Sequence, residues 1–374
     1  MKTLNINMIK SILTISFALT IFLSANAQSN QLTDFYYYNP ILDAKTEEIF
    51  QSLSDADRVA QMIVTSAGEL GKSDTTVLRL ARENKIGGIV FLKGTKDNHK
   101  KLIAQLNSVS NAQNQVPLLY SIDAEPSLFN SRVRGTKRVM KTIDIKTPHQ
   151  SDSIARIINH HLLHMGFRQN FAPVVDVSPQ NEAIKNRSFG SDQEKVIELS
   201  KQFMQTTQQQ GIVATAKHFP GHGLVKGDTH KKSVYIDGEL KELGVYPPLI
   251  QSGLLSIMTA HITIINNPQY NTNGLPASCS RNIVTGLLKN ELGFRGLIIT
   301  DALNIMKAVT IIDNAPLLAS KAGNDMLLMP TDETKSINSI LMEMTRDPNY
   351  REQVYQSVKK IIRLKLCLGL LEGK

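Results

Sequence analysis

The sequence predicts an α/β fold in which eight parallel strands, each followed by a helix, close into a single (β/α)8 TIM barrel. Two observations support this prediction. Eight short apolar runs rich in β-branched residues alternate with helical patterns, and no Pro/Ser-rich linker divides them. The length of 374 residues and the hydrophobic content of 41% suit one large core, as in single-domain barrels.

The N-terminal segment is typical of a secretory signal. Two lysines precede an apolar stretch from Ile12 to Leu23, and small residues follow at Ser24–Ala27. This order predicts a signal peptide over residues 1–27, cleaved after Ala27. A membrane anchor is the alternative, but the apolar run is short for a span of ~20 residues. We therefore expect residues 28–374 to form one exported domain, periplasmic or secreted, without stable membrane insertion.

Composition excludes several classes of protein. The two cysteines, Cys279 and Cys367, are too few for a disulfide framework and argue against a metal site built on cysteine. The formal net charge is +9, but no basic run interleaved with aromatic residues indicates a nucleic-acid partner. We expect neither a metal nor an organic cofactor.

The expected strands and helices follow the alternating pattern. Strands are predicted at Val59–Thr65, Gly88–Leu92, Pro117–Asp123, Asn170–Val177, Val213–His218, Ser256–His261, Gly296–Asp301 and Asp325–Met329. Helices are predicted from near Thr46 and at Ser151–Met165, Glu194–Gln210, Arg281–Leu292, Ser336–Arg346 and Tyr350–Leu371. An open doubly wound sheet is the alternative, but the Gly-rich phosphate fingerprint that would favour it is absent.

Ionisable residues end the third to the seventh predicted strands. They are Asp123, Asp176, Lys217 with His218, His261 and Asp301. Burying a charge costs on the order of several kcal/mol unless the charge is paired or used. Because the active sites of barrels lie at the carboxyl ends of their strands, we expect a site there.

The most informative segment reads KHFPGHG from Lys217 to Gly223 and is followed by Asp228-Thr229-His230. Its proline and glycines demand a special backbone path, so we expect the loop to bend over the barrel mouth and carry Asp228 and His230 inward. A carboxylate two residues before a histidine can bond one imidazole nitrogen and leave the other free to move a proton. The alternative is a surface loop with incidental polar residues.

Three further segments bring polar residues to strand ends. GLIITDAL delivers Asp301, whose carboxylate can act as a nucleophile or, alternatively, cap the next helix. The D-A-E step at Asp123 offers carboxylate acceptors for hydroxyl groups. FAPVVD ends in Asp176 and is followed by NRSFG, which contains Arg187, and a structural Arg187–Asp176 ion pair is one interpretation.

The run KHFPGHG…DTH resembles the signature of glycoside hydrolase family 3, in its N-acetylglucosaminidase branch, where D-S-H stands at the same spacing. GLIITDAL, FAPVVD with NRSFG, and MTAH ending at His261 also resemble family motifs, and the resemblance extends from about Val59 to Leu371. Thr229 stands in place of that Ser, and two further departures occur. Ala302 stands where relatives often have a second Asp, and residues 126–130 replace a glycine pair and a nearby Arg, which leaves the role of Arg132 open.

The resemblance implies a role for each matching residue. Asp301 is then the nucleophile, His230 the general acid/base and Asp228 its partner. Asp123, Arg187, Lys217 and His218 are implied to bind the sugar, and His261 either lines the site or is a core histidine.

The implied reaction removes a terminal non-reducing β-N-acetylglucosamine with retention, through a covalent glycosyl-enzyme. The alternatives are a phosphorylase that uses the same dyad and a catalytically inactive glycan-binding protein. The presence of Asp301, Asp228 and His230 together argues against an inactive protein.

Overall fold

The structure, a computed structural model, describes residues 31–177, 181–227 and 233–371. The predicted signal peptide and the predicted pair Asp228 and His230 lie outside the described residues. Within the described residues, no helix is both long and apolar enough to cross a membrane. Cys279 and Cys367 are buried and unpaired with each other.

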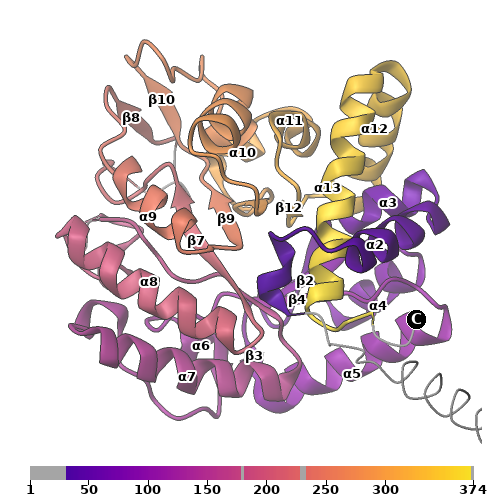
Figure 1. Cartoon of the computed structure of the whole chain (residues 1–374), viewed down its shortest axis with the longest axis horizontal. Coiled ribbons are helices and arrows are strands. Elements are labelled where there is room, and N and C mark those ends of the chain that lie inside the picture. Colours follow the sequence, from indigo (N-terminus) through magenta and orange to yellow (C-terminus); the bar gives the residue numbers. More distant parts are fainter. Residues whose placement is uncertain (1–30, 178–180, 228–232, 372–374) are drawn as a thin grey trace, which may run out of the picture. The chain divides into compact units, whose positions relative to one another are not determined.

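The predicted barrel is confirmed. Eight parallel strands follow the order β11-β9-β7-β6-β4-β2-β1-β12, and a parallel bridge from Ile299 to Met326 links the two outer strands of this order (Figure 1). The strands are β1 (Ile63–Ala67), β2 (Gly88–Phe91), β4 (Leu119–Ile122), β6 (Gln169–Asn170), β7 (Val213–Phe219), β9 (Ser256–Thr259), β11 (Leu297–Thr300) and β12 (Leu327–Leu328). Two small parallel pairs lie outside this sheet: β3 (Gly94–Thr95) with β5 (Val133–Arg134), and β8 (Tyr235–Asp237) with β10 (Thr263–Ile265).

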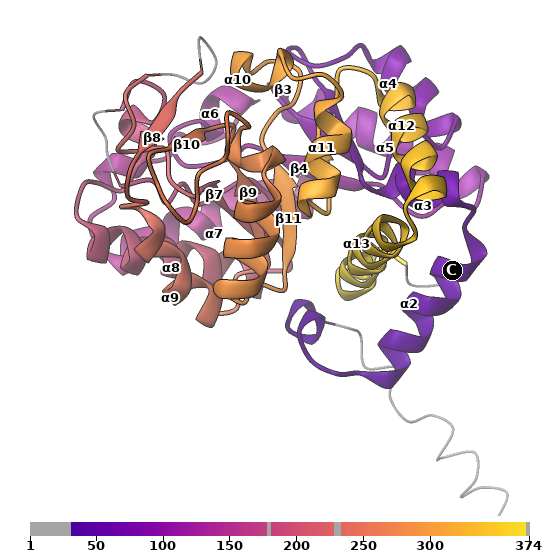
Figure 2. The same cartoon turned by 90° about the horizontal axis from the view of Figure 1, so that it is seen from above.

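Helices cover the outside of the strands, as Figures 1 and 2 show. The α-helices are α2 (Pro40–Ser52), α3 (Asp55–Gln61), α4 (Asp74–Arg82), α5 (Lys96–Ala112), α6 (Phe129–Arg132), α7 (Pro148–Met165), α8 (Gln193–Gln209), α9 (Tyr246–Gln251), α10 (Lys307–Thr310), α11 (Ala315–Ala322), α12 (Glu333–Arg346) and α13 (Pro348–Cys367). Short 3-10 turns are η1 (Leu32–Phe35), η2 (Thr142–Asp144), η3 (Lys185–Arg187), η4 (Leu243–Val245) and η5 (Ala277–Cys279), and η6 (Asn282–Glu291) is a π-helix.

Local sequence signals explain where the helices begin and end. In α7, Thr147 caps the N-terminus in a capping box with Gln150, Pro148 occupies the first turn, and Gly166 ends the helix in the left-handed conformation. The first predicted helix begins at Pro40 instead of near Thr46, because Asn39 caps it and proline suits a first helical turn.

Two predicted strands have different bounds in the structure. β1 begins at Ile63 and not at Val59, because Ser54 caps a helix that runs from Asp55 to Gln61. The predicted strand Asn170–Val177 is regular only at Gln169–Asn170, and further on Val174 makes a single parallel bridge to Lys217. Pro173 lies in this stretch and has no N–H to give to a ladder of hydrogen bonds.

A polar layer crosses the interior of the barrel below the site. Gln169 of β6 accepts a hydrogen bond from Ser121 of β4 at 2.8 Å and donates to Thr215 of β7 at 3.2 Å. All three side chains are buried among apolar neighbours. Because a buried polar group is costly when unpaired, these bonds fix how β4, β6 and β7 stand relative to one another. β7 carries Lys217 and His218 of the site described next, and Asp123 directly follows β4.

Candidate active site

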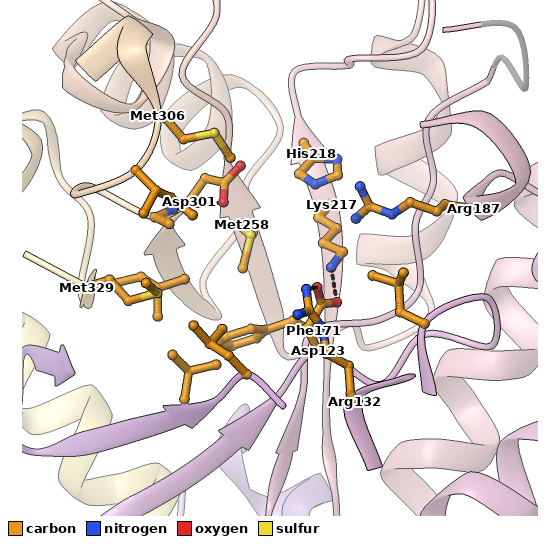
Figure 3. A pocket seen from close by; sticks show the side chains of 16 residues that line it. Asp123, Arg132, Phe171, Arg187, Lys217, His218, Met258, Asp301, Met306 and Met329 are labelled. Carbon is orange, nitrogen blue, oxygen red and sulfur yellow. Dashed lines mark hydrogen bonds and ion pairs between the residues drawn. The ribbon is translucent and has the colours of Figure 1, made fainter. Parts of the chain in front are cut away.

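A cavity of about 120 Å³ opens at the carboxyl ends of the strands. Its polar lining consists of Asp123, Arg132, Arg187, Lys217, His218 and Asp301, and its apolar lining includes Phe171, Met258, Met306 and Met329 (Figure 3). The site therefore lies where the sequence predicts it, at the end of the barrel at which active sites of this fold occur. A mixed lining of this kind can hold a sugar, which has apolar faces and a rim of hydroxyls.

Lys217, at the end of β7, joins two carboxylates from the segment after β4. Its Nζ lies 2.5 Å from Asp123 Oδ1 and 3.3 Å from Glu125 Oε2. Arg132 adds a weaker contact, with Nη2 3.4 Å from Asp123 Oδ2. Burial raises the pKa of Asp123, but the charges of Lys217, Arg132 and Arg187 outweigh burial and hold that pKa below its usual range. Asp123 is therefore ionised and can accept hydrogen bonds from groups that enter the cavity.

Arg187 makes a bidentate ion pair with Glu125, whose side chain is fully buried. Its Nε lies 2.5 Å from Oε1, and its Nη2 lies 3.1 Å from Oε2. This pair replaces the Arg187–Asp176 pair considered from the sequence. Glu125 was not among the predicted site residues. The signal that could have found it is the D-A-E step that it shares with Asp123.

Asn170 holds the backbone that presents Asp123 and Glu125. Its Oδ1 accepts from the Ala124 N–H at 3.0 Å, and its Nδ2 donates to the Ala124 carbonyl at 3.3 Å. Asn170 is the last residue of β6, so the strand next to β4 fixes the turn that follows β4. Sequence reasoning missed this residue, because a lone asparagine carries no distinctive signal.

Asp301 follows β11 and faces Lys217 and His218 across the cavity (Figure 3). Its N–H donates to the Thr259 carbonyl at 2.9 Å, and its Oδ1 accepts from the Ala302 N–H at 2.7 Å. The alternative role as a helix cap is wrong, because the next helix, α10, has Met306 at its N-cap.

The environment of Asp301 keeps it ionised. Burial raises its pKa, but the imidazoles of His218 and His261 and the Ala302 N–H have the larger combined effect and lower it. A carboxylate that stays ionised on a rigid strand end is suited to attack on, or stabilisation of, a positively charged carbon.

His218 lies between the cavity and a buried carboxylate. Its Nδ1 is 2.7 Å from Asp176 Oδ2, and burial lowers the pKa of the imidazole to about 3. The ring is therefore neutral. This hydrogen bond assigns the ring proton to Nδ1 and leaves Nε2 as an acceptor.

Two of the predicted strand-end residues do not line the cavity. Asp176 is buried behind His218. His261 is also buried, with Nδ1 2.7 Å from Ser278 Oγ and Nε2 3.2 Å from the Ala302 carbonyl. Of its two possible roles, His261 is thus a hydrogen-bonded core histidine that holds the backbone next to Asp301.

The structure brings together five of the seven predicted site residues: Asp123, Arg187, Lys217, His218 and Asp301. It also places Arg132, whose role the sequence left open, in the same lining. Across residues 31–177, 181–227 and 233–371, no group of three or more His, Cys, Asp or Glu side chains is arranged to hold a metal ion.

Comparisons with known proteins agree with this geometry. Residues 55–364 match the glycosyl hydrolase family 3 N-terminal domain. A beta-hexosaminidase from Nitrosomonas eutropha is 32% identical over 264 residues, which are 66% of this chain and 74% of the relative. A beta-hexosaminidase from Tolumonas auensis is 30% identical over 68% of this chain and 78% of its own length.

Solved structures give the same result. A family 3 beta-N-acetylglucosaminidase from Paenibacillus is 28% identical, with a TM-score of 0.76 over 86% of this chain and 64% of that chain. A beta-N-acetylhexosaminidase from Beutenbergia cavernae is 25% identical, with a TM-score of 0.73 over 83% of this chain and 97% of that chain.

The barrel, its pocket and these relationships define an enzyme that hydrolyses glycosidic bonds. The chain belongs to glycosyl hydrolase family 3, as its motifs indicate.

Proposed function

We propose that this glycoside hydrolase is a retaining, exo-acting β-N-acetylhexosaminidase that removes a terminal non-reducing N-acetylglucosamine. The observation that carries the proposal is the position of Asp301, which faces the polar cluster of Asp123, Lys217, His218 and Arg187 across one cavity. The names of the relatives from Nitrosomonas and Tolumonas, both beta-hexosaminidases, support this choice of sugar.

In the proposed mechanism, Asp301 attacks the anomeric carbon and forms a covalent glycosyl-enzyme, while the bond to the leaving oxygen breaks. His230, protonated, gives its proton to that oxygen. A water molecule then gives its proton to His230 and attacks the anomeric carbon, which releases Asp301 and the sugar with net retention. Asp228 orients the imidazole. Support for Asp228 and His230 comes from the sequence motif, since both lie outside the described residues.

A histidine in this role has a physical advantage. Many retaining glycosidases use a second carboxylate as the acid/base. A neutral imidazole avoids a second negative charge beside Asp301 and its ester. No proton transfer in this scheme needs a metal or an organic cofactor.

The cavity lining suits recognition of sugar hydroxyls. Asp123 accepts hydrogen bonds from two hydroxyl groups, and Lys217 and Arg187 donate to the hydroxyl oxygens. His218 accepts through Nε2. The ion pairs of these side chains hold each one in place before the sugar binds, which reduces the entropy lost on binding.

The proposed substrates follow from the proposed signal peptide. We propose that residues 28–374, as one domain, act outside the cytoplasm on peptidoglycan fragments or chitooligosaccharides that end in N-acetylglucosamine. The partner is then a carbohydrate, with neither nucleic acid nor stable membrane insertion involved.

The first test is release of a chromophore from aryl β-N-acetylglucosaminide and from aryl β-glucoside by residues 28–374. We expect release from the acetamido sugar, and none from it when Asp301→Ala is used. Products analysed with and without phosphate distinguish the free sugar from a sugar 1-phosphate, which would indicate a phosphorylase. A folded protein that releases nothing from either sugar would contradict the proposal.

A further inference from the structure

One buried carboxylate near the site takes no part in the proposed chemistry. Glu242, in the segment between β8 and η4, is 4% exposed and does not line the cavity. Its Oε1 accepts from the N–H of Val177 at 2.7 Å and from that of Gly223 at 3.1 Å. Its Oε2 accepts from the N–H of Leu224 at 3.0 Å. Glu242 thus binds the backbone of the loop that leaves β7.

Asp176 binds the backbone of the same loop. Its Oδ1 accepts from the N–H of His222 at 2.7 Å and from that of His218 at 3.3 Å. Two buried carboxylates therefore receive four N–H groups of the run from His218 to Leu224. Because a buried N–H group is costly to leave unpaired, these four hydrogen bonds hold this run of backbone in place.

Gly221 shows how closely the loop approaches Glu242. The glycine has φ of +137°, and a Cβ placed on it would lie 2.5 Å from Glu242 Cβ and 2.8 Å from Oε2. No other residue fits at that distance. Position 221 of the KHFPGHG run must therefore be glycine, because Glu242 leaves no room there for a side chain.

Glu242 also joins the two ends of the loop. The chain leaves β7, returns through β8, and reaches Glu242 only 18 residues after Leu224. On the outgoing side, the Val225 carbonyl accepts from Asn181 Nδ2 at 2.7 Å. On the returning side, the Val234 carbonyl accepts from the Thr263 N–H at 3.0 Å. Fixing both ends of a loop restricts the conformations of the residues between them. Asp228 and His230 belong to this stretch of sequence.

We propose that Glu242 is a positioning residue that, together with Asp176, fixes the base of the loop that carries the acid/base His230. Proton transfer to the leaving group then depends on Glu242, although Glu242 does not touch the substrate. The inference rests on the proposed function, because it assumes that His230 is the acid.

The test uses two aryl β-N-acetylglucosaminides, one with an acidic phenol and one with a weakly acidic phenol as leaving group. Only the second needs a proton as it leaves. We expect Glu242→Ala to lower kcat/KM for the weakly acidic phenol at least about tenfold more than for the acidic one. This tenfold difference is part of the ~10²–10⁴-fold rate increase that acid/base catalysis contributes. Glu242→Gln keeps an acceptor for Val177 and Gly223 and should recover most of the difference.

Glu333→Ala is the matched control. Glu333 is also a buried carboxylate, at 3% exposure, but it binds Lys72 and Thr65 away from the loop. We expect this variant to lose stability while both substrates are affected equally. Gly221→Ala, which pushes Glu242 away, provides a second route to the same leaving-group effect if Glu242→Ala does not fold.

His230→Ala separates the two proposals. Suppose that His230→Ala lowers kcat/KM more for the weakly acidic phenol than for the acidic one, while the Glu242 and Gly221 variants lower both equally. In that case the positioning role is wrong and the proposed function stands. If His230→Ala itself does not discriminate, the acid/base assignment fails, and the positioning role falls with it.

Discussion

Lys217 Nζ and Asp123 Oδ1 lie 2.5 Å apart, which joins the carboxyl ends of β7 and β4 across the floor of the cavity. The same ammonium reaches Glu125, so one cation serves two carboxylates. Removing it leaves both carboxylates without their shared partner, whereas removing Asp123 still leaves Lys217 paired with Glu125.

Lys217→Met should therefore lower both stability and activity. Loss of one partner of a buried pair costs about 3–5 kcal/mol of unfolding free energy. We expect a loss of that order in urea unfolding, and a fall in kcat/KM on the order of 10²-fold from lost substrate contacts. Asp123→Asn should reduce kcat/KM with a much smaller loss of stability, and an equal loss in the two variants would contradict this explanation.

Asp301→Ala should nearly abolish turnover, because among the residues that the structure describes no other carboxylate of the cavity lining faces the cluster from the β11 side. The measurement is single-turnover release of the aryl group, which reports the glycosylation step directly. Full activity in this variant would disprove the nucleophile assignment.

His230→Ala should slow hydrolysis by roughly 10²–10⁴-fold on substrates with poor leaving groups. The physical reason is that a poor leaving group cannot depart without a proton. Steady-state kinetics on a series of aryl leaving groups would measure the effect. A uniform loss across the series would indicate that His230 binds substrate without transferring a proton.

Arg187→Lys should weaken substrate binding although the charge is kept. The guanidinium makes two parallel bonds to Glu125, and an ammonium cannot reproduce that geometry. We expect a higher KM for the acetamido sugar and a lower Tm. Unchanged kinetics in Arg187→Lys would show that the charge alone is sufficient at this position.

Lys365 predicts a pH dependence of stability. It is fully buried in α13, where it donates to Gln61 Oε1 at 2.7 Å and to the Gly87 carbonyl at 2.8 Å. Burial lowers its pKa to about 7, so between pH 7 and about 10.5 the unfolded chain binds a proton that the folded protein does not. The free energy of unfolding should therefore rise with pH across this window. The stability gained in this way is absent below pH 7, where Lys365 is protonated in both states.

Urea unfolding of the Lys365→Met variant between pH 7 and 10 tests this effect. We expect the rise in unfolding free energy to be smaller than in the parent protein. The exposed Lys195→Met substitution is the control and should leave the slope unchanged. A Lys365→Met variant with the parent slope would contradict the assignment.

The sequence predicted the site residues that belong to strand-end motifs. Asp123, Lys217, His218 and Asp301 each directly follow an apolar run or end it, and the strands of a barrel point their carboxyl ends to one face. The strand bounds were predicted less well at β1 and β6. There, a helix cap at Ser54 and the proline at position 173 override the apolar pattern.

The sequence by itself thus determined the eight-strand order of elements, the family and the face on which the site lies, because periodicity and motif spacing are local properties of the chain. Only the tertiary structure decided which polar groups pair. Arg187 meets Glu125 across 62 positions, His218 meets Asp176 across 42, and Glu242 reaches back to Val177 across 65. These pairs exist because the closed barrel brings distant strand ends together, and local patterns carry no information about which of those side chains come within bonding distance.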